Sequence, residues 1–312
     1  MQERILEALE HIQSEKKFFS FEQNEKQTDA VTVYINYYQL PTEGVKYQYG
    51  YVHSGNKEIY LQSFAPDNPR GTVFLMHGYL DHLGCLSPFI TYLTGQGYQV
   101  IGFDLPGHGL STGEKASIDD FQEYVEVLDN VLNLVINDIH TPLYLVAHST
   151  GAAISFSYLV KQHHCFERVV MIAPLIRAAS FRVSQILFIL ARPFIKHFPR
   201  VFRANSKEQA FLEFIKKDPL QAKKLSMNWV GAKLKWFNAI KGGQACECDV
   251  LILQGDQDKT VDWKYNLSYL EKSVPNNEIH VVEGGGHHLL NEVHLLQEKI
   301  FQQIERFFST EK

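Results

Sequence analysis

The sequence has 312 residues, of which 45% are hydrophobic, 21% charged and 12% aromatic. Its 20 glycines, 11 prolines and 4 cysteines exclude the collagen-like, low-complexity and disulfide-scaffold classes. The length suits one large domain, or a domain that carries an insertion. The net charge of −5 argues against a general nucleic-acid binder. No run of about 18 apolar residues predicts a membrane-spanning helix.

The first segment of the chain is typical of an amphipathic helix, because Ile5, Leu6, Leu9 and Ile12 recur at helical spacing. Glutamates interrupt this segment, so it lacks the apolar core of a signal peptide. We therefore expect a helical extension over about residues 1–30 and a cytoplasmic protein.

The four cysteines, Cys85, Cys165, Cys246 and Cys248, lie in unrelated sequence contexts. This favours reduced thiols in an intracellular chain over a disulfide framework. The Cys246-x-Cys248 pair lacks the second pair that a zinc site of this kind needs, so we expect it to be structural.

From about residue 45 onward, short apolar runs rich in β-branched residues alternate with helical patterns. The predicted strands are Val45–Val52, Lys57–Phe64, Thr72–Met76, Val100–Phe103, Leu143–Ala147, Arg168–Ile172, Val250–Gln254 and Glu278–Val282. The first two are expected to pair antiparallel across a polar turn. The others are mostly continuous apolar runs, typical of parallel strands that are buried on both faces.

Helical patterns separate these strands. One is predicted to start at Ser117 as N-cap, with Asp120 three residues later. Others cover Gly151–Gln162, Asp262–Lys272 and Asn291–Phe308. The alternation predicts a doubly wound, mostly parallel α/β sheet.

One long segment, from about residue 177 to 241, shows helical stretches and no strand pattern. Its helical stretches are broken at Pro193, Pro199 and Pro219. The segment is too long for a plain crossover between strands. We expect a helical cap at 176–245, inserted between a first core part at 1–175 and a second at 246–312.

The strongest chemical signal is Ser149, which stands between an apolar strand and a helix of small residues. A sharp strand–serine–helix turn lifts the serine Oγ above the sheet. The N–H of Thr150, at the start of the helix, would face developing negative charge. The motif departs from G-x-S-x-G only at Ala147, and its structural alternative is a serine that caps an ordinary helix.

Four more motifs stand at the ends of predicted strands, two before Ser149 and two after it. With the serine motif, they are His77–Tyr79, Asp104–Ser111, His148–Ala152, Gln254–Asp258 and Glu283–His287. In these motifs the sequence resembles the serine α/β-hydrolase superfamily, and within it the monoacylglycerol lipase and bacterial lysophospholipase group. The resemblance extends from about residue 45 to the C-terminus. It implies the α/β-hydrolase fold with an inserted cap and a Ser–acid–His triad, and it is much less specific for the substrate.

A serine nucleophile needs a general base and an acid that orients the base. His287 follows a strand and a loop of three glycines, and it occupies the family's histidine position, whereas His288 is expected at a helix start or in the pocket wall. Asp256, Asp258 and Asp262 all follow the preceding strand. The resemblance selects Asp258, whereas a turn role suits Asp256 and a helix cap suits Asp262.

The oxyanion hole is expected from the loop after the strand Thr72–Met76. Gly78 allows the backbone to approach the substrate, and the Tyr79 N–H would be the second donor beside Thr150. We expect Gly78 and His148 to contact the substrate.

Two features of the sequence could indicate a metal site or a phosphate site. His77 and His82 could form a metal pair, but their spacing fits no common zinc motif, and a hydrogen bond to the loop is the preferred role for His77. The glycine-rich loop Asp104–Ser111 contains neither phosphate-binding pattern, so its tightness and a hydrogen bond of Asp104 explain it better. We therefore expect no cofactor and no metal.

The segment from Arg177 to Lys235 is strongly basic and rich in bulky apolar residues. It holds 13 lysines and arginines against 3 acids, a net charge of +10, which leaves −15 for the rest of the chain. Such a segment predicts a surface for anionic lipid, with an apolar face for acyl chains. The alternative is a cap that packs its apolar face on the core while its lysines are solvated.

Together these features predict a serine esterase that acts on a lipid with one acyl chain, a lysophospholipid or a monoacylglycerol. A short-chain carboxylesterase is the alternative among enzymes, and a non-catalytic binding protein of the same fold is the alternative outside them. The expected partners are a small lipid ester and, at the periphery, an anionic membrane. No nucleic acid is expected.

Overall fold

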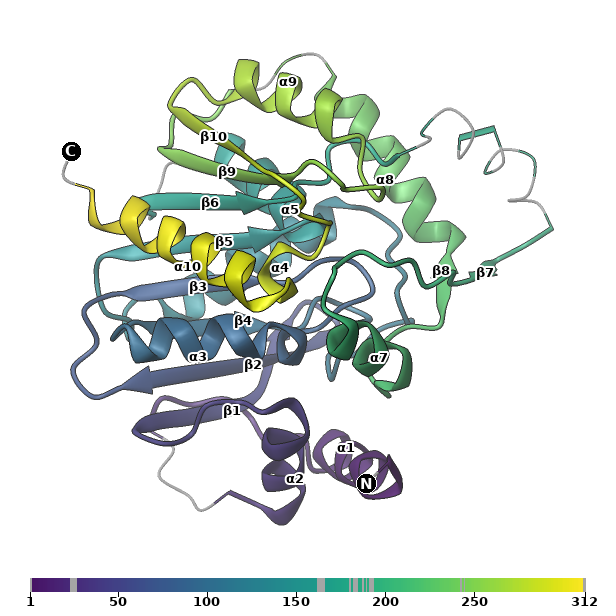
Figure 1. Cartoon of the computed structure of the whole chain (residues 1–312). Coiled ribbons are helices and arrows are strands. Elements are labelled where there is room, and N and C mark those ends of the chain that lie inside the picture. Colours follow the sequence, from purple (N-terminus) through teal and green to yellow (C-terminus); the bar gives the residue numbers. More distant parts are fainter. Residues whose placement is uncertain are drawn as a thin grey trace.

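A computed structural model describes residues 2–22, 27–161, 166–179, 194–241 and 245–310, together with Phe181, Gln185, Ile186, Phe188, Leu190 and Gly243. Its centre is an eight-stranded sheet in the order β1-β2-β4-β3-β5-β6-β9-β10, with helices on both faces (Figure 1). The expected α/β-hydrolase class of fold is confirmed.

The eight strands lie where the sequence patterns predict them, to within two residues at each end. They are β1 (Val45–Ser54), β2 (Lys57–Pro66), β3 (Thr72–Met76), β4 (Gln99–Phe103), β5 (Leu143–His148), β6 (Arg168–Ile172), β9 (Val250–Gly255) and β10 (Asn277–Val282). β2 pairs antiparallel with both β1 and β4, and the remaining pairs are parallel. The carboxyl ends of β3, β5, β9 and β10 therefore meet at one edge of the sheet.

Helices cover both faces of the sheet, because its central strands are apolar on both sides. They are α3 (Ser87–Gly95), α4 (Gln122–Val135), α5 (Thr150–Lys161), α9 (Trp263–Ser273) and α10 (His294–Ser309), with 3₁₀ turns η1 (Leu83–Leu86) and η2 (Leu289–Asn291). One apolar core lies between the sheet and α4, α5 and α9, and a second lies between the sheet and α3 and α10.

Two helical starts test the capping predictions. α9 begins after Asp262, whose carboxylate accepts a hydrogen bond from the Tyr265 N–H, as expected of an N-cap. The prediction for Ser117 is wrong, since α4 begins only at Gln122. The Ser117 hydroxyl instead accepts a hydrogen bond from Ser226, 2.9 Å away in a distant part of the chain.

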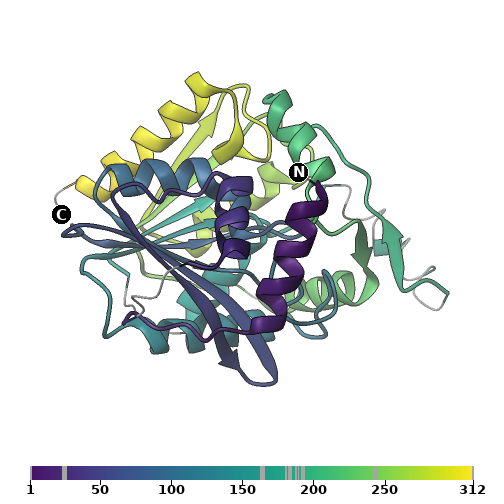
Figure 2. The ribbon, with the colours of Figure 1, turned by 90° about the horizontal axis from the view of Figure 1, so that it is seen from below.

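The N-terminal extension contains two helices that pack together and against the β1–β2 end of the sheet (Figure 2). α1 (Gln2–Glu15) buries three of the four predicted positions and Ala8, whereas Leu6 is 48% exposed. α2 (Asp29–Tyr38) was not predicted, because its β-branched and tyrosine residues favour strands by propensity. The Thr28 side chain caps this helix at the Val31 N–H.

The long segment between β6 and β9, called the insertion below, joins two strands that are parallel neighbours in the sheet. Its described elements are β7 (His197–Pro199), α7 (Gln209–Lys217), β8 (Lys224–Ser226) and α8 (Met227–Ile240). The expectation of a segment without strands is wrong, since β7 pairs antiparallel with β8. Three residues are too few to show an alternating pattern.

Two of the three prolines that were expected to break the helical stretches lie within the described residues. α7 ends just before Pro219, as predicted, and Pro199 is the last residue of β7. Pro193, Gln162 and Cys165, like Arg182 and Arg192 of the basic segment, lie outside the described residues. Among the helices of the described ranges, none is long and apolar enough to cross a membrane.

Candidate active site

Ser149 occupies a strained turn between β5 and α5, at the carboxyl edge of the sheet. Its φ is +53°, a left-handed conformation that a non-glycine residue adopts only where its surroundings impose it. The Ser149 N–H donates to the Ile172 carbonyl, and its own carbonyl accepts from Ala153 and Leu175. These bonds hold the turn that aims Oγ away from the sheet.

The turn also requires a glycine at position 151, two residues after Ser149. A Cβ at Gly151 would lie 2.7 Å from the His77 carbonyl oxygen, closer than real Cβ atoms approach such an atom. Gly151 therefore lets α5 start directly against the end of β3.

The structure brings Ser149, His287 and Asp258 together in one chain of hydrogen bonds. His287 Nε2 lies 3.0 Å from Ser149 Oγ, and His287 Nδ1 lies 2.7 Å from Asp258 Oδ2. All three residues are buried, with Ser149 only 5% exposed. This is the geometry of a serine nucleophile with a histidine base that a carboxylate orients.

Asp258 is the only one of the three candidate acids that contacts His287 in the described residues. Its Oδ1 accepts hydrogen bonds from the N–H groups of Thr260 and Val261, and its Oδ2 also accepts one from Gln254. Burial alone would raise the pKa of Asp258, but the adjacent imidazole and these donors lower it to about 2. The carboxylate is therefore ionised throughout the physiological range.

The two alternative acids perform the local roles that their positions suggest. Asp256 Oδ1 accepts a hydrogen bond from the Gly284 N–H and so joins the loop after β9 to the loop after β10. Asp262 caps α9 and pairs with Arg177.

The loop after β3 lies directly against the nucleophile. A Cβ at Gly78 would lie 3.0 Å from His148 Nδ1 and 3.1 Å from Ser149 Cβ. The Tyr79 ring stacks on Trp229 at 3.6 Å, and its hydroxyl donates to the Ala116 carbonyl. These contacts hold the Tyr79 side chain, while Gly78 brings the loop against Ser149 at the start of α5, whose leading N–H groups have no partner within the helix.

His148 and His288 form a buried histidine pair beside the triad. His148 Nε2 lies 3.0 Å from the His287 carbonyl, so this nitrogen carries the proton and Nδ1 is an acceptor. Burial lowers the pKa of His148 to about 3 and that of His288 to about 4, which keeps both rings neutral. His288 Nδ1 lies 3.6 Å from Asp81, and the His288 side chain makes no capping bond to η2. His288 thus stands at the N-cap position of η2, as expected of a helix start, although its side chain does not cap the turn.

The remaining motif residues perform structural roles. His77 Nε2 accepts a hydrogen bond from the Leu105 N–H, as expected of a residue that ties two loops together. Asp104 accepts hydrogen bonds from Leu83 and Leu110. A Cβ at Gly109 would lie 2.0 Å from Asp104, so that glycine is required for the loop to close on its aspartate.

Some residues beside the site were not singled out from the sequence. Trp229 covers the loop after β3 from α8, and Asp81 faces His288. Trp229 stands in an insertion without a motif, so no pattern could find it. Asp81 stands two residues after Tyr79, and this closeness to a catalytic loop was the available signal.

Comparisons with known proteins agree with this geometry. A family described as serine aminopeptidase, S33, matches residues 67–294. A monoglyceride lipase homologue of monkeypox virus is 27% identical over 260 residues, which cover 80% of this chain and 94% of the relative. A probable lysophospholipase L2 of Haemophilus influenzae is 26% identical, with 83% and 91% covered.

Among solved structures, a soluble variant of the monoglyceride lipase of Saccharomyces cerevisiae, in complex with a substrate analogue, aligns with a TM-score of 0.73. That alignment covers 86% of this chain and 97% of the yeast chain, at 18% identity. The expected resemblance to the serine α/β-hydrolases is confirmed. Because the family model covers more than half of the sequence, the chain belongs to the serine aminopeptidase S33 family of α/β-hydrolases.

Proposed function

We propose that this chain hydrolyses carboxylic esters of lipids with a single acyl chain, through an acyl-enzyme on Ser149. The observation that carries the proposal is the continuous hydrogen-bonded line from Ser149 through His287 to Asp258. The names of the relatives, monoglyceride lipase and lysophospholipase, support an ester of this kind.

Each residue has one role in this reaction. Ser149 Oγ attacks the ester carbonyl while His287 Nε2 accepts its proton and then returns it to the leaving alcohol. Asp258 keeps the imidazole in the required tautomer and stabilises its protonated form. Water then gives a proton to His287 and attacks the acyl carbonyl, and His287 returns that proton to Ser149 Oγ as the fatty acid leaves.

Two backbone N–H groups, those of Tyr79 and Thr150, would stabilise the oxyanion of each tetrahedral intermediate. Removing one such donor typically costs about 3–4 kcal/mol of transition-state stabilisation. Gly78 and His148 would contact the substrate beside the nucleophile, because Gly78 lies against both His148 and Ser149.

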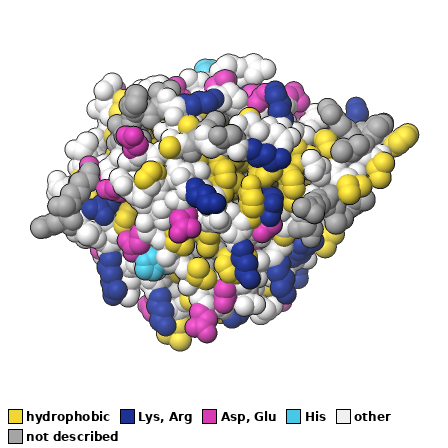
Figure 3. All heavy atoms as spheres, turned by 90° about the horizontal axis from the view of Figure 1, so that it is seen from above, with side chains coloured by type: hydrophobic (Ala, Val, Ile, Leu, Met, Phe, Trp, Pro, Cys, Tyr) yellow, Lys and Arg dark blue, Asp and Glu magenta, His cyan; other side chains and the backbone are white. Residues whose placement is uncertain are grey.

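Residues 176–245 would act as a cap, with cores 1–175 and 246–312 below it. Several apolar side chains of this segment are exposed: Ile186, Leu190, Phe194, Ile195 and Val201. They stand among basic residues that include Lys196 and Arg203. In Figure 3, hydrophobic side chains occupy the projecting edge of the molecule on the right, and lysines and arginines flank this region.

An exposed apolar edge beside positive charge is suited to peripheral contact with an anionic membrane. The lysines would attract the lipid headgroups, and the apolar side chains would enter the interface. This favours a phosphate-bearing lysophospholipid over a neutral glyceride.

The decisive experiment compares hydrolysis of a lysophospholipid and a monoacylglycerol, with Ser149→Ala as the blank. A series of p-nitrophenyl esters of increasing chain length separates the lipid esterase from a short-chain carboxylesterase. We expect kcat/KM to rise with acyl length, and a sharp preference for acetate would refute the lipid substrate. Failure of folded wild-type protein to react with a fluorophosphonate probe would refute catalysis itself.

Membrane contact has its own test, which uses vesicles with and without anionic lipid. Phe194→Asp, at a side chain that is 86% exposed, should reduce binding to anionic vesicles. Leu295→Asp is the matched control, since Leu295 is 76% exposed but lies on α10. Equal loss in both variants would contradict a contact through the cap.

A further inference from the structure

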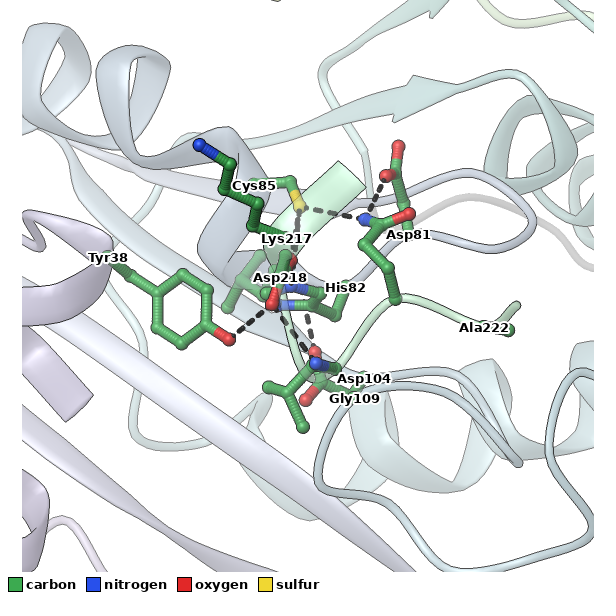
Figure 4. A network of polar contacts seen from close by, with 12 residues as sticks. Tyr38, Asp81, His82, Cys85, Asp104, Gly109, Lys217, Asp218 and Ala222 are labelled. Atoms are coloured by element: carbon green, nitrogen blue, oxygen red, sulfur yellow. Dashed lines mark hydrogen bonds and ion pairs between the residues drawn. The ribbon is translucent and has the colours of Figure 1, made fainter. Parts of the chain in front are cut away.

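A second cluster of reactive side chains lies outside the triad, where the loop after β3 meets the end of α7. It consists of His82, Cys85 and Asp218, all buried, and Figure 4 shows their side chains pointing toward one another. His82 Nε2 lies 2.8 Å from Asp218 Oδ2 and 3.3 Å from Cys85 Sγ, and Cys85 Sγ lies 3.8 Å from Asp218 Oδ2. The proposed hydrolysis uses none of these groups.

The three ligand atoms form a triangle of the size that a metal ion requires. With these separations, a single point lies about 2 Å from all three atoms, and Zn²⁺ bonds to nitrogen, oxygen and sulfur measure roughly 2.0–2.3 Å. An ion slightly out of the plane of the triangle would therefore bind all three without backbone movement.

The charges of the three groups also suit a divalent cation. A thiolate, a carboxylate and a neutral imidazole together carry −2, so an M²⁺ ion would make this fully buried site neutral. Metal binding would displace the thiol proton of Cys85, as it does in other thiolate sites.

Surrounding groups hold two of the ligands in position. The Tyr38 hydroxyl donates to Asp218 Oδ1 at 2.7 Å, and the Leu220 N–H donates to the same oxygen. Gln221 Nε2 donates to Cys85 Sγ at 3.2 Å, a bond that strengthens when sulfur is a thiolate. Such outer partners orient metal ligands, and the ion would replace the hydrogen bond between His82 Nε2 and Asp218 Oδ2.

An entry path exists on the protein surface. A cavity of about 460 Å³ lies between α2, α7 and α10, and Tyr38, Gly84 and Cys85 are part of its lining. An ion could reach the sulfur from this cavity without passing the catalytic serine.

We propose that His82, Cys85 and Asp218 bind one Zn²⁺ ion, which joins the loop after β3 to the end of α7. A ligand set of nitrogen, sulfur and oxygen favours this borderline-soft ion over Mg²⁺ or Ca²⁺. The ligands would come from His82-x-x-Cys85 and a distant aspartate, whereas the sequence argued against a pair of His82 with His77 and no metal was expected.

The test measures metal directly on the full chain. Elemental analysis of protein saturated with Zn²⁺ and then gel-filtered should give about one equivalent per chain. Co²⁺ in place of Zn²⁺ should give a thiolate-to-cobalt charge-transfer band, which reports the bond to sulfur. In Cys85→Ser and Asp218→Asn, bound metal should fall at least about tenfold.

Cys246→Ser is the matched control, because Cys246 is also a buried free thiol but lies far from the cluster in the sequence. It should keep the metal and the cobalt band. Where Cys85→Ser does not fold, alkylation of wild-type Cys85 provides the same information, and Zn²⁺ should slow it. The proposal is overturned when folded wild-type protein binds no Zn²⁺, when the cobalt complex lacks the sulfur band, or when Cys85→Ser binds metal as well as wild type.

Discussion

Substitution of Gly78 by alanine tests how closely the loop after β3 must approach the nucleophile. The new Cβ would lie 3.0 Å from His148 Nδ1 and 3.1 Å from Ser149 Cβ. Ordinary contacts of this kind begin at 3.4 Å, so the loop or the serine must move by a few tenths of an ångström. Misplacement by about 1 Å costs on the order of 10²-fold in rate. A shift of roughly 0.4 Å therefore predicts a loss of about 5- to 10-fold in kcat/KM.

The assay is steady-state hydrolysis of a p-nitrophenyl ester, together with urea unfolding of each variant. Added volume in a packed site should also lower the free energy of unfolding by about 1–3 kcal/mol. Gly95→Ala is the control, since a Cβ at Gly95 would meet nothing within 4 Å. It should leave both quantities near wild type. A Gly78→Ala enzyme with unchanged kcat/KM and unchanged stability would refute the reasoning.

Three further predictions concern buried titratable groups. Asp258→Asn should lower kcat by about 10³- to 10⁴-fold in ester hydrolysis, because the amide cannot stabilise protonated His287; a loss below tenfold would contradict the role of the acid. Lys233→Met should raise the free energy of unfolding in urea by about 1 kcal/mol, because burial lowers the pKa of this lysine and the desolvation cost of its amine outweighs its hydrogen bond to the Ile176 carbonyl and its contact with the Trp236 ring at 3.9 Å; a destabilised variant would oppose this. Burial lowers the pKa of His108 to about 4 from its ordinary value of 6.5, so the unfolded chain takes up this proton first and stability falls as pH decreases from about 6.5 to 4. His108→Asn should reduce that slope by about 1.4 kcal/mol per pH unit in urea titrations across this range, and an unchanged slope would be evidence against it.

The sheet was predictable because its strands are signalled locally. A run such as Thr72–Met76 is apolar after its first residue, so its burial on both faces follows from its own residues. The helix Asp29–Tyr38 was not predictable in this way. Its valine, isoleucine and tyrosine residues favour strands, and tertiary packing against α1 and the sheet overrides that preference.

The candidate triad was accessible from sequence because each member follows a strand and the strand ends meet at one edge. Choosing Asp258 over Asp256 required the family resemblance, since both stand within four residues of the β9 run. Asp218 shows what sequence cannot supply. It is one of three acids in a basic segment, and only the fold places its carboxylate 2.8 Å from His82.

The N-terminal helices α1 and α2 contact α7 and the residue that follows it. Gln2 Nε2 donates to the Lys217 carbonyl, Tyr38 donates to Asp218, and the Tyr37 ring packs against Phe214. The family model begins only at residue 67, so a chain trimmed to that boundary would keep all three triad residues and lose every one of these contacts. These contacts hold α7 against α1 and α2. Any outward movement of the insertion must therefore either start at its opposite end or first break these contacts.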